Sequence, residues 1–380
     1  METAPDGSGT VVPAQSIAIG NFLTVFAVGR DASNGFIGNV QAESWSLVNI
    51  TGGVVAGDLV EDEVFTEFTI PTSGSTPQGI VTGPDGNLWF TEYSGNKIGR
   101  ITRTGVITEF SVPTASSGPW HIVVGPDGNL WFAEYAVGKL ARITTAGAIT
   151  EYAVGASTPQ GLASGPDGNL WFTEVATNKI GRMTTSGTGF TEFSIPTTNS
   201  LPRAITPGPD GSLWFLEGAG KVGRITTAGV VTEFPIAWNS SPTDIVAGAD
   251  GNLWFVESGT ATIGRITTAG VITEFVTSGT LFGIGAGPDG NVWFTAASKI
   301  GRVTPAGVIT RFSVPSSGSN VLDIVAGPEG ALWFVEQLTG RVGRAGSKAV
   351  FTAHASGSAA VHTVKSGFSS VDSGTLTVPP

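Results

Sequence analysis

The chain has 380 residues, which is enough for two or three domains, and only 13% of them are charged. Gly, Val, Ile, Thr and Phe take the place of the Leu, Ala, Glu and Lys of helical proteins, so we expect an almost entirely β-structure. The net charge of −11 argues against nucleic acid or an anionic membrane as a partner, because such binding needs clustered Lys and Arg. No apolar run approaches a transmembrane length, so no membrane insertion is expected.

Short strands are predicted at both ends of the chain. In residues 1–60, alternating apolar residues at Leu23–Val28 and Glu43–Val48 give each predicted strand one core face, and Ser-Gly and Thr-Gly-Gly turns separate the strands. Residues 346–380 again predict short strands around Ser-Gly turns. Each segment is half of a sandwich, so we expect the two halves to form one domain.

The middle of the chain is a repeat. Gly83–Phe90 (GPDGNLWF) returns six more times, at intervals of 39 to 43 residues, with copies beginning at Gly125, Gly165, Gly208, Gly248, Gly287 and Gly327. A period near 40 with Gly-rich turns and a fixed Trp is typical of propeller blades.

Each repeat predicts four strands, which we name inner, second, third and outer. In the first repeat these are Gly79–Gly83, Asn87–Glu92, Lys97–Thr102 and Val106–Phe110. Asp85-Gly86-Asn87 resembles a calcium loop but lacks the alternating Asp ligands of such loops. We interpret it as a turn between the inner and second strands, in which Gly86 takes the left-handed position.

Counting strands predicts how the ring closes. Seven repeats supply seven inner, second and third strands, but only six outer strands follow their own third strand. The seventh, Val64–Phe68 (VFTEF), precedes the first repeat and is expected to complete the last blade by pairing Glu67 with Arg344. We therefore expect a seven-bladed β-propeller of four-stranded blades at residues 61–345, inserted into a sandwich formed by residues 1–60 and 346–380.

Opposite charges are predicted to face each other in the blades. A hairpin centred on Thr104-Gly105 places Arg100 opposite Glu109, and such a pair contributes a few tenths of a kcal/mol up to about 1 kcal/mol. The same spacing predicts the pairs Arg142–Glu151, Arg224–Glu233 and Arg265–Glu274, and it sets Arg302 against Arg311.

Trp89–Phe110 resembles the virginiamycin B lyase family of seven-bladed propellers through Trp-Phe-Thr-Glu, Asn-Lys-Ile-Gly-Arg-Ile and Val-Ile-Thr-Glu-Phe. The resemblance runs from about Glu61 to Arg344, and all seven repeats carry Gly-x-x-Gly-x-x-Trp-Phe. It implies linearisation of streptogramin B antibiotics, in which a histidine base and a metal ion open an ester bond by elimination.

The two ends together resemble a bacterial Ig-like domain of the kind found in tandem on surface proteins. The segments that carry this resemblance are Ser16–Arg30, Ser44–Val60, Ala349–Gly357 and Asp372–Val378. It implies a protein that is secreted or displayed on the cell surface, with an export signal that is not part of this sequence.

The histidines of the lyase family lie in Pro-His-Ala-Ile or Pro-His-Gly-Ile at the start of inner strands. None of the seven corresponding start positions is histidine; they are Gln78, Trp120, Gln160, Arg203, Thr243, Phe282 and Leu322. His121, one place further along, is the remaining catalytic candidate, since His354 and His362 fall in the predicted sandwich. We expect no cofactor or metal ion, and Mg²⁺ only if the protein is a lyase.

The start positions and the loops beside them differ from blade to blade, on the face where propellers usually bind ligands. Aromatic and mixed charged residues there suit a sugar, a peptide or a protein loop. The predicted ligand-binding mouth consists of Gln78, Tyr93, Trp120, His121, Tyr135, Gln160, Arg203, Trp238, Asp244, Phe282 and Asp323. Ordinary surface variation is the alternative interpretation.

A carboxylate recurs at the end of six second strands. These residues are Glu92, Glu134, Glu174, Glu217, Glu257 and Glu336, with Ala296 in the remaining blade. A ring of six could bind a divalent cation or a basic ligand. The alternative, which we favour, is that each Glu accepts hydrogen bonds within its own blade.

The sequence thus predicts a bacterial binding or structural module, with a protein, peptide or glycan at the propeller mouth. The apolar surface and the sandwich edges also suggest a homo-oligomer or filament formed through the Ig-like domain. A streptogramin B lyase and a glycan-binding propeller are the alternatives.

Overall fold

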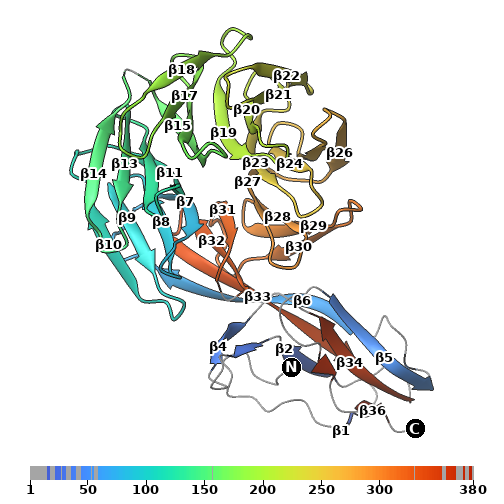
Figure 1. Ribbon diagram of the computed structural model, residues 1–380. Coiled ribbons are helices and arrows are strands. Elements are labelled where there is room, and N and C mark those ends of the chain that lie inside the picture. The colour runs from blue at the N-terminus through green and yellow to red at the C-terminus, as the bar shows by residue number, and fades with distance from the viewer. Residues whose placement is uncertain are drawn as a thin grey trace.

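The structure is a computed structural model, and it describes residues 15–17, 22–26, 28–30, 36–39, 44–52, 54, 59–155, 157–328, 330–352, 357–364, 371–372 and 376–378. Every regular element in these residues is a strand, which confirms the predicted all-β class. Seven antiparallel sheets surround a central axis as propeller blades (Figure 1). No helix in the described part of the chain is long and apolar enough to cross a membrane.

The first six blades each consist of four consecutive strands. Blade 1 contains β7 (Pro77–Thr82), β8 (Leu88–Glu92), β9 (Lys97–Ile101) and β10 (Ile107–Ser111). Blade 2 contains β11 (Pro119–Val124), β12 (Leu130–Glu134), β13 (Lys139–Ile143) and β14 (Ile149–Ala153). Blade 3 contains β15 (Pro159–Ser164), β16 (Leu170–Glu174), β17 (Lys179–Met183) and β18 (Thr191–Ser194).

Blades 4 to 6 repeat this order. Blade 4 contains β19 (Pro202–Pro207), β20 (Leu213–Glu217), β21 (Lys221–Ile225) and β22 (Val231–Pro235). Blade 5 contains β23 (Pro242–Ala247), β24 (Leu253–Glu257), β25 (Thr262–Ile266) and β26 (Ile272–Val276). Blade 6 contains β27 (Leu281–Ala286), β28 (Val292–Ala296), β29 (Lys299–Val303) and β30 (Ile309–Ser313).

Blade 7 joins the two ends of the propeller. Its strands are β31 (Val321–Ala326), β32 (Leu332–Glu336), β33 (Arg341–Thr352) and, as the outer strand, β6 (Leu59–Thr69). The outer strand therefore precedes blade 1 in the sequence, and the predicted closure of the ring is confirmed.

The repeated octapeptide builds the turn and the core of each blade. Gly86 lies in the left-handed region at φ +72°, as predicted, and Asp85 Oδ1 accepts a hydrogen bond from Trp89 Nε1 at 3.0 Å. The Trp of each second strand is fully buried and stacks on the outer-strand aromatic of its blade, as Trp89 does on Phe110 with 5.5 Å between ring centroids. The turn and the Trp thus serve the fold, in agreement with the turn interpretation.

The third and outer strands pair one residue away from the predicted register. Glu109 faces Gly99, and Arg100 faces Thr108. The reason is a three-residue hairpin loop closed by Thr102, in which Gly105 has a φ of +91°. The predicted Arg–Glu pairs are therefore wrong by one position, and the residues that face Glu151, Glu233, Glu274 and Arg311 are Ala141, Gly223, Gly264 and Gly301.

The third-strand arginines instead cover the tryptophans. Arg100 Cζ lies 5.6 Å from the centroid of the Trp89 ring, a cation–π contact. The same contact recurs in the other six blades, in the pairs Arg142–Trp131, Arg182–Trp171, Arg224–Trp214, Arg265–Trp254, Arg302–Trp293 and Arg344–Trp333.

Outer-strand glutamates tie neighbouring blades together. Glu109 forms an ion pair with Lys97 at 2.8 Å, and its other oxygen accepts a hydrogen bond from the backbone N–H of Thr72 at 2.9 Å. Thr72 lies in the loop that leaves the preceding blade, and its hydroxyl accepts from Lys97 at 2.6 Å. We call this cluster the interblade clasp, and it recurs as Thr114–Lys139–Glu151 and Thr197–Lys221–Glu233.

A clasp of the same kind closes the ring. Glu67 accepts from Arg341 at 2.5 Å and from the backbone N–H of Ser316 at 3.0 Å. Glu67 faces Gly343 and Arg344 faces Thr66, so the predicted Glu67–Arg344 pair is wrong by the same one-residue shift.

The last blade continues into a second group of strands. β33 and β6 stay paired for 11 register positions and leave the propeller as a ribbon, at the end where the other blades have the hairpin loop (Figure 1). There β2 (Phe22–Phe26) pairs with β33, and β5 (Ser44–Gly52) pairs with β34 (Gly357–Val364). The remaining strands are β1 (Gln15–Ser16), β3 (Val28–Arg30), β4 (Phe36–Asn39), β35 (Val371–Asp372) and β36 (Leu376–Val378).

The two ends of the chain therefore pair with each other. β2 and β5 cover most of the predicted strands Leu23–Val28 and Glu43–Val48, of which Ala27 and Glu43 lie outside the described residues. The predicted domain boundaries, at 60/61 and 345/346, fall inside β6 and β33. The Ig-like assignment of these strands stays a prediction.

Candidate functional site

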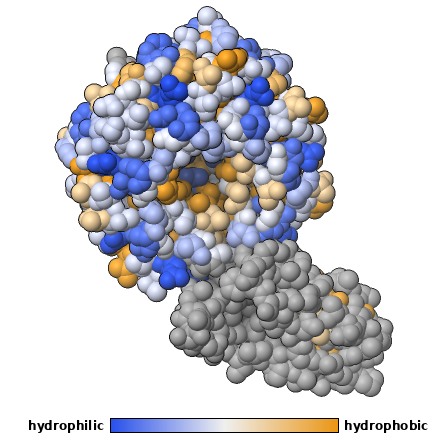
Figure 2. Space-filling model, in the orientation of Figure 1, coloured by the Kyte–Doolittle hydropathy of each residue, from blue (hydrophilic) through white to orange (hydrophobic). Residues whose placement is uncertain are grey.

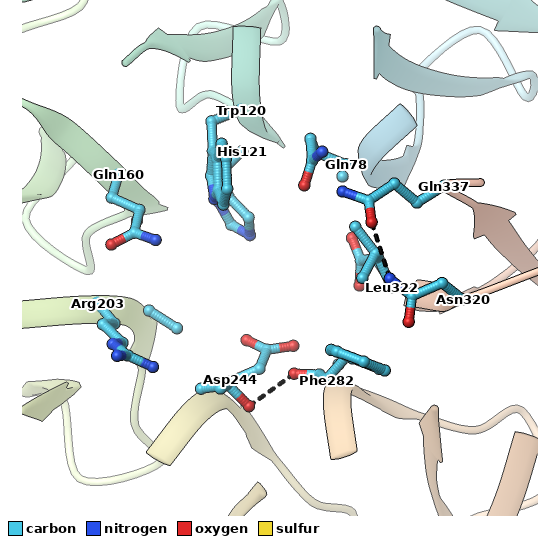
Figure 3. A pocket seen from close by; sticks show the side chains of 16 residues that line it. Gln78, Trp120, His121, Gln160, Arg203, Asp244, Phe282, Asn320, Leu322 and Gln337 are labelled. Atoms are coloured by element: carbon cyan, nitrogen blue, oxygen red, sulfur yellow. Dashed lines mark hydrogen bonds between the residues drawn. The ribbon is translucent and has the colours of Figure 1, made fainter. Parts of the chain in front are cut away.

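The inner strands begin around a cavity of about 340 Å³ on the propeller axis (Figure 3). All seven start positions line it, namely Gln78, Trp120, Gln160, Arg203, Thr243, Phe282 and Leu322. The inner strands start beside the loops between second and third strands, at the opposite end of the blades from the ribbon. Figure 2, in the orientation of Figure 1, shows a hollow at the centre of the ring, with hydrophobic and hydrophilic residues around it.

Most of the predicted mouth residues meet in this cavity. Those that line it are Gln78, Trp120, His121, Gln160, Arg203, Asp244, Phe282 and Asp323. Tyr93 and Tyr135 do not, but both pack on Trp120, with ring centroids 5.5 and 5.3 Å from its own. They therefore position Trp120.

Trp238 lies outside the cavity. Its side chain is 85% exposed, and it is not among the lining residues. It follows Glu233 by five residues, the spacing that places Thr72 after Glu67 and Thr114 after Glu109 in the clasps. Trp238 thus stands where a clasp would need Thr, and Glu274 of the next blade has no hydrogen-bond partner among the described residues.

The mouth prediction omits eight lining residues, namely Gly79, Gly161, Ala204, Thr243, Gly283, Asn320, Leu322 and Gln337. Asn320 Nδ2 donates to Gln337 Oε1 at 2.8 Å, and both side chains line the cavity. Gln337 follows the second-strand Glu336 directly, as Tyr93 follows Glu92, so the position of Tyr93 in the repeat could have identified it.

In six of the seven blades, the position after the start residue lies at a seam between neighbouring blades. In blades 2, 5 and 7 a side chain there accepts the backbone N–H of the next inner strand: His121 from Leu162, Asp244 from Ile284 and Asp323 from Ile80. In blades 1, 3 and 6 the position is Gly, and a second-strand Thr donates instead to the next blade, as Thr91 does to Trp120 O at 2.6 Å. These cavity residues therefore also hold the ring together.

His121 presents a donor to the cavity. Its Nδ1 accepts the N–H of Leu162 at 3.3 Å, which leaves the proton of a neutral ring on Nε2. Burial lowers the pKa of His121 to about 4, so the ring is neutral at physiological pH. Figure 3 shows the ring directed toward the cavity.

The two aspartates are held rigidly. Asp244 accepts the N–H groups of Ile245 and Ile284, each at 2.9 Å, and Asp323 accepts those of Ile324 and Ile80, each at 2.8 Å. Burial raises the pKa of Asp244 to about 6. Burial, and then electrostatic repulsion from Asp244, raise the pKa of Asp323 to about 8. The ionisation of one carboxyl group therefore disfavours the ionisation of the other.

Arg203 is the cation that lines the cavity. Its Nη1 donates one long hydrogen bond, 3.4 Å, to Pro242 O, and no carboxylate among the described residues pairs with it. Burial lowers the pKa of Arg203, although the guanidinium stays charged at neutral pH.

The predicted carboxylate ring does not form one site. Each of the six second-strand glutamates is at most 1% exposed and lies under the loop of its own blade, as Glu92 does beneath Gly95. In three blades a loop Thr donates to it: Thr177 to Glu174, Thr260 to Glu257 and Thr339 to Glu336. In the described part of the chain, no three acidic, histidine or cysteine side chains converge to hold a metal ion.

Comparison with protein families gives an extended match. The model of the virginiamycin B lyase family matches residues 63–281 and 237–367. The virginiamycin B lyase of Bacillus licheniformis is 45% identical over 40 residues, a segment that spans 10% of this chain and only 14% of that relative.

Solved structures of virginiamycin B lyases are similar over the propeller. The enzyme from Staphylococcus aureus is 36% identical with a TM-score of 0.71, covering 75% of this chain and 99% of that one. A catalytically inactive histidine-to-alanine variant of the Staphylococcus aureus enzyme, with quinupristin, is 35% identical with the same TM-score and the same coverage. The hydrazine synthase of Kuenenia stuttgartiensis, 18% identical with a TM-score of 0.61 over 72% of this chain and 96% of that one, shares the fold alone.

Proposed function

The chain belongs to the virginiamycin B lyase family, and we propose that it binds a ligand in the axial cavity without cleaving it. His121 carries this proposal, because it is the one histidine in the propeller sequence. A general base must offer a lone pair to the proton that it removes. The lone pair of Nδ1 is occupied by the N–H of Leu162, and Nε2 carries the proton, so His121 can donate a hydrogen bond to a ligand but not take its proton.

The cavity wall supports binding of a small polar ligand. It combines apolar surfaces from Trp120, Phe282 and Leu322 with amide and charged groups, as small-molecule sites usually do. Trp120 is fixed by Tyr93 and Tyr135, so it offers a ring face that needs no ordering when a ligand arrives.

Ligand binding is tested with a panel of oligosaccharides and short peptides, using isothermal titration calorimetry on the full chain. Trp120→Ala is expected to weaken binding by about 10-fold or more through lost contact area. Trp238→Ala is the matched control, because this Trp is exposed outside the cavity, and it should leave the affinity unchanged. Failure of the whole panel to bind, or equal losses in both variants, would contradict a ligand site in the cavity.

Streptogramin B lyase activity is the second candidate. The 36% identity to the Staphylococcus aureus enzyme favours it, and Asp323, with a pKa raised to about 8 by burial, is the carboxylate suited to act as a base. Mg²⁺ would belong to this alternative only.

Incubation with quinupristin and Mg²⁺ distinguishes the two functions. Ring opening by elimination leaves the mass unchanged, so chromatography and the new alkene signals in the NMR spectrum are the appropriate measurements. We expect intact substrate with the wild-type chain. Linear product that disappears in His121→Ala or Asp323→Ala, each checked for folding by circular dichroism, would establish the lyase and overturn the binding proposal.

We also propose that the protein is secreted or displayed on the cell surface and self-associates through the strands outside the propeller. The support is the resemblance of the segments that contain those strands to bacterial Ig-like domains. Light scattering of the full chain over a range of concentrations tests the second part, and a constant monomer mass would contradict it.

A further inference from the structure

We propose that the cavity selects a zwitterionic ligand, whose carboxylate binds at Arg203 and whose ammonium group binds at Asp244 and Asp323. The ligand class is thus an amino acid, or a short peptide that carries both charges. The inference rests on the proposed ligand-binding function and specifies its chemistry.

One wall of the cavity consists of hydrogen-bond donors. Arg203, Gln160 and His121 come from the adjacent blades 4, 3 and 2, and Figure 3 shows all three side chains on the same side of the cavity. Arg203 has only its long bond to Pro242 O, and His121 directs an N–H inward. This wall can receive a carboxylate, for which the planar guanidinium offers paired N–H groups.

The aspartates form an acceptor wall. Asp244 and Asp323 come from blades 5 and 7, and each oxygen already accepts one backbone N–H, which fixes the carboxyl groups in place. With pKa values raised to about 6 for Asp244 and about 8 for Asp323, the two carboxyl groups together carry roughly one negative charge at neutral pH. Their remaining lone pairs can accept the N–H groups of an ammonium. A metal ion is a poor occupant, because no third ligand converges there among the described residues.

The structure keeps these opposite charges apart. No ion pair joins Arg203 to Asp244 or to Asp323, although all three line one cavity. Charged groups that are withdrawn from water without a partner carry a desolvation cost. A ligand with a carboxylate and an ammonium group offsets the desolvation cost of both Arg203 and the aspartates. A ligand with one charge leaves one of these groups without a partner.

The size of the cavity suits such a ligand. About 340 Å³ lies at the lower end of the range of roughly 300–1,000 Å³ for small-molecule sites. Trp120, Phe282 and Leu322 supply an apolar surface for an aliphatic chain between the two charged ends.

A series of ω-amino acids serves as a molecular ruler for this site. Glycine, β-alanine, 4-aminobutyrate and 6-aminohexanoate are titrated into the full chain by calorimetry, each beside the alkylamine and the carboxylate of the same length. We expect the affinity to peak at one length and to exceed that of both singly charged analogues by about 10-fold or more.

Arg203→Gln is the decisive variant, because Arg203 makes a single long hydrogen bond and its loss should not disturb the fold. It should weaken binding of the best zwitterion by about 10-fold to 100-fold and leave binding of the matching alkylamine unchanged. The control is Arg103→Gln, an exposed arginine on the hairpin loop at the opposite end of blade 1, which should have no effect.

Two results would overturn the inference. One is an alkylamine or a simple carboxylate that binds as tightly as the zwitterion, and the other is an Arg203→Gln variant with unchanged affinity. If panel ligands bind through Trp120 while the ruler compounds show no preference for two charges, ligand binding stands and the zwitterion inference fails. If no compound of either series binds, both proposals fail.

Discussion

The buried second-strand glutamates differ in whether a loop hydroxyl group donates a hydrogen bond to them. Glu174, Glu257 and Glu336 each accept from a Thr three residues later, whereas both carboxylate oxygens of Glu92, Glu134 and Glu217 lack a hydrogen-bond partner among the described residues. An unpaired buried carboxylate destabilises the fold when it is charged. The absence of a donor hydroxyl group therefore lowers the stability of the fold in blades 1, 2 and 4.

Val137→Thr should stabilise the protein. Val137 follows Glu134 by three residues, as Thr177 follows Glu174, and the exchange of a methyl for a hydroxyl hardly changes the volume. We expect a gain of about 1 kcal/mol in the free energy of unfolding at pH 8.5, where Glu134, with a pKa raised to about 7 by burial, is ionised. Urea denaturation measures this gain.

The reciprocal change provides the control. Thr177→Val removes the donor to Glu174 and should lower the free energy of unfolding by a similar amount. Equal midpoints for the wild type and both variants would show that the hydroxyl contact does not matter.

Variation within a faithful repeat was the signal that located the cavity residues. The seven start positions carry six different residue types while the octapeptide stays nearly constant, and the structure gathers all seven around the axis. The side-chain direction of loop residues could not be predicted in the same way, because no strand fixes it. The predicted mouth therefore includes Trp238, which points to solvent, and omits Asn320 and Gln337, which line the cavity.

At the scale of the elements, the interblade clasps explain why blade 6 has an arginine where the outer strands of the other blades have glutamate. Arg311 stands where the other outer strands carry Glu, and its guanidinium donates to Thr277 and to Ser278 of the preceding loop. The clasp is thus preserved in position with the donor and acceptor exchanged. A pairing of Arg302 with Arg311 had no such explanation.

Glu109→Ala should be more harmful than the same change in a blade without a clasp. It removes the ion pair with Lys97 and the bond to Thr72, and we expect a loss of about 1–2 kcal/mol in the free energy of unfolding. Glu274→Ala is the matched control, because Glu274 is exposed and forms no clasp, so its effect should stay within about 0.5 kcal/mol. Chemical denaturation of both variants tests this, and equal losses would contradict a stabilising role of the clasp.

The type and order of the elements could be predicted, but not the register between two of them. Strand periodicity and the count of outer strands were enough for seven blades and for closure by β6. The hairpin loop has three residues, and whether a loop holds two or three depends on the left-handed conformation of Gly105. Because the loop has three residues, all the predicted Arg–Glu pairs are wrong by one residue.

At the scale of the molecule, the stability of the fold depends on pH through groups that act in opposite directions. Burial raises the pKa of the second-strand glutamates to about 7 or 8 from an ordinary value of 4.5. Between pH 4.5 and pH 8 the folded chain therefore binds more protons than the unfolded chain. The free energy of unfolding that these protonated glutamates allow below about pH 4.5 is lost as the pH rises through 8. Asp323, with a pKa raised to about 8, contributes in the same direction.

His121 and the clasp carboxylates oppose this trend at low pH. Burial lowers the pKa of His121 to about 4 from 6.5, so its contribution falls as the pH drops below 6.5. Hydrogen bonds from Lys97 and Thr72 outweigh the effect of burial and lower the pKa of Glu109, so the clasp loses stability when the pH falls below the ordinary value of 4.5. His121 is outnumbered by the buried glutamates above about pH 4.5, so the greatest stability is expected near pH 5, at the acid end of the usual range.

The thermal midpoint should accordingly be higher at pH 5.5 than at pH 8.5. Glu92→Gln identifies the cause, because Glu92 is fully buried with a pKa of about 8 and the amide cannot ionise. This variant should gain stability at pH 8.5 and change little at pH 5.5, so its midpoint depends less on pH than that of the wild type. Glu274→Gln changes an exposed site whose charge is a lesser cause of the raised pKa of Glu257, so it should alter the dependence much less. Calorimetric melting at both pH values decides the matter: a wild-type midpoint that rises from pH 5.5 to 8.5 would mean that these glutamates are ionised at no cost to the fold.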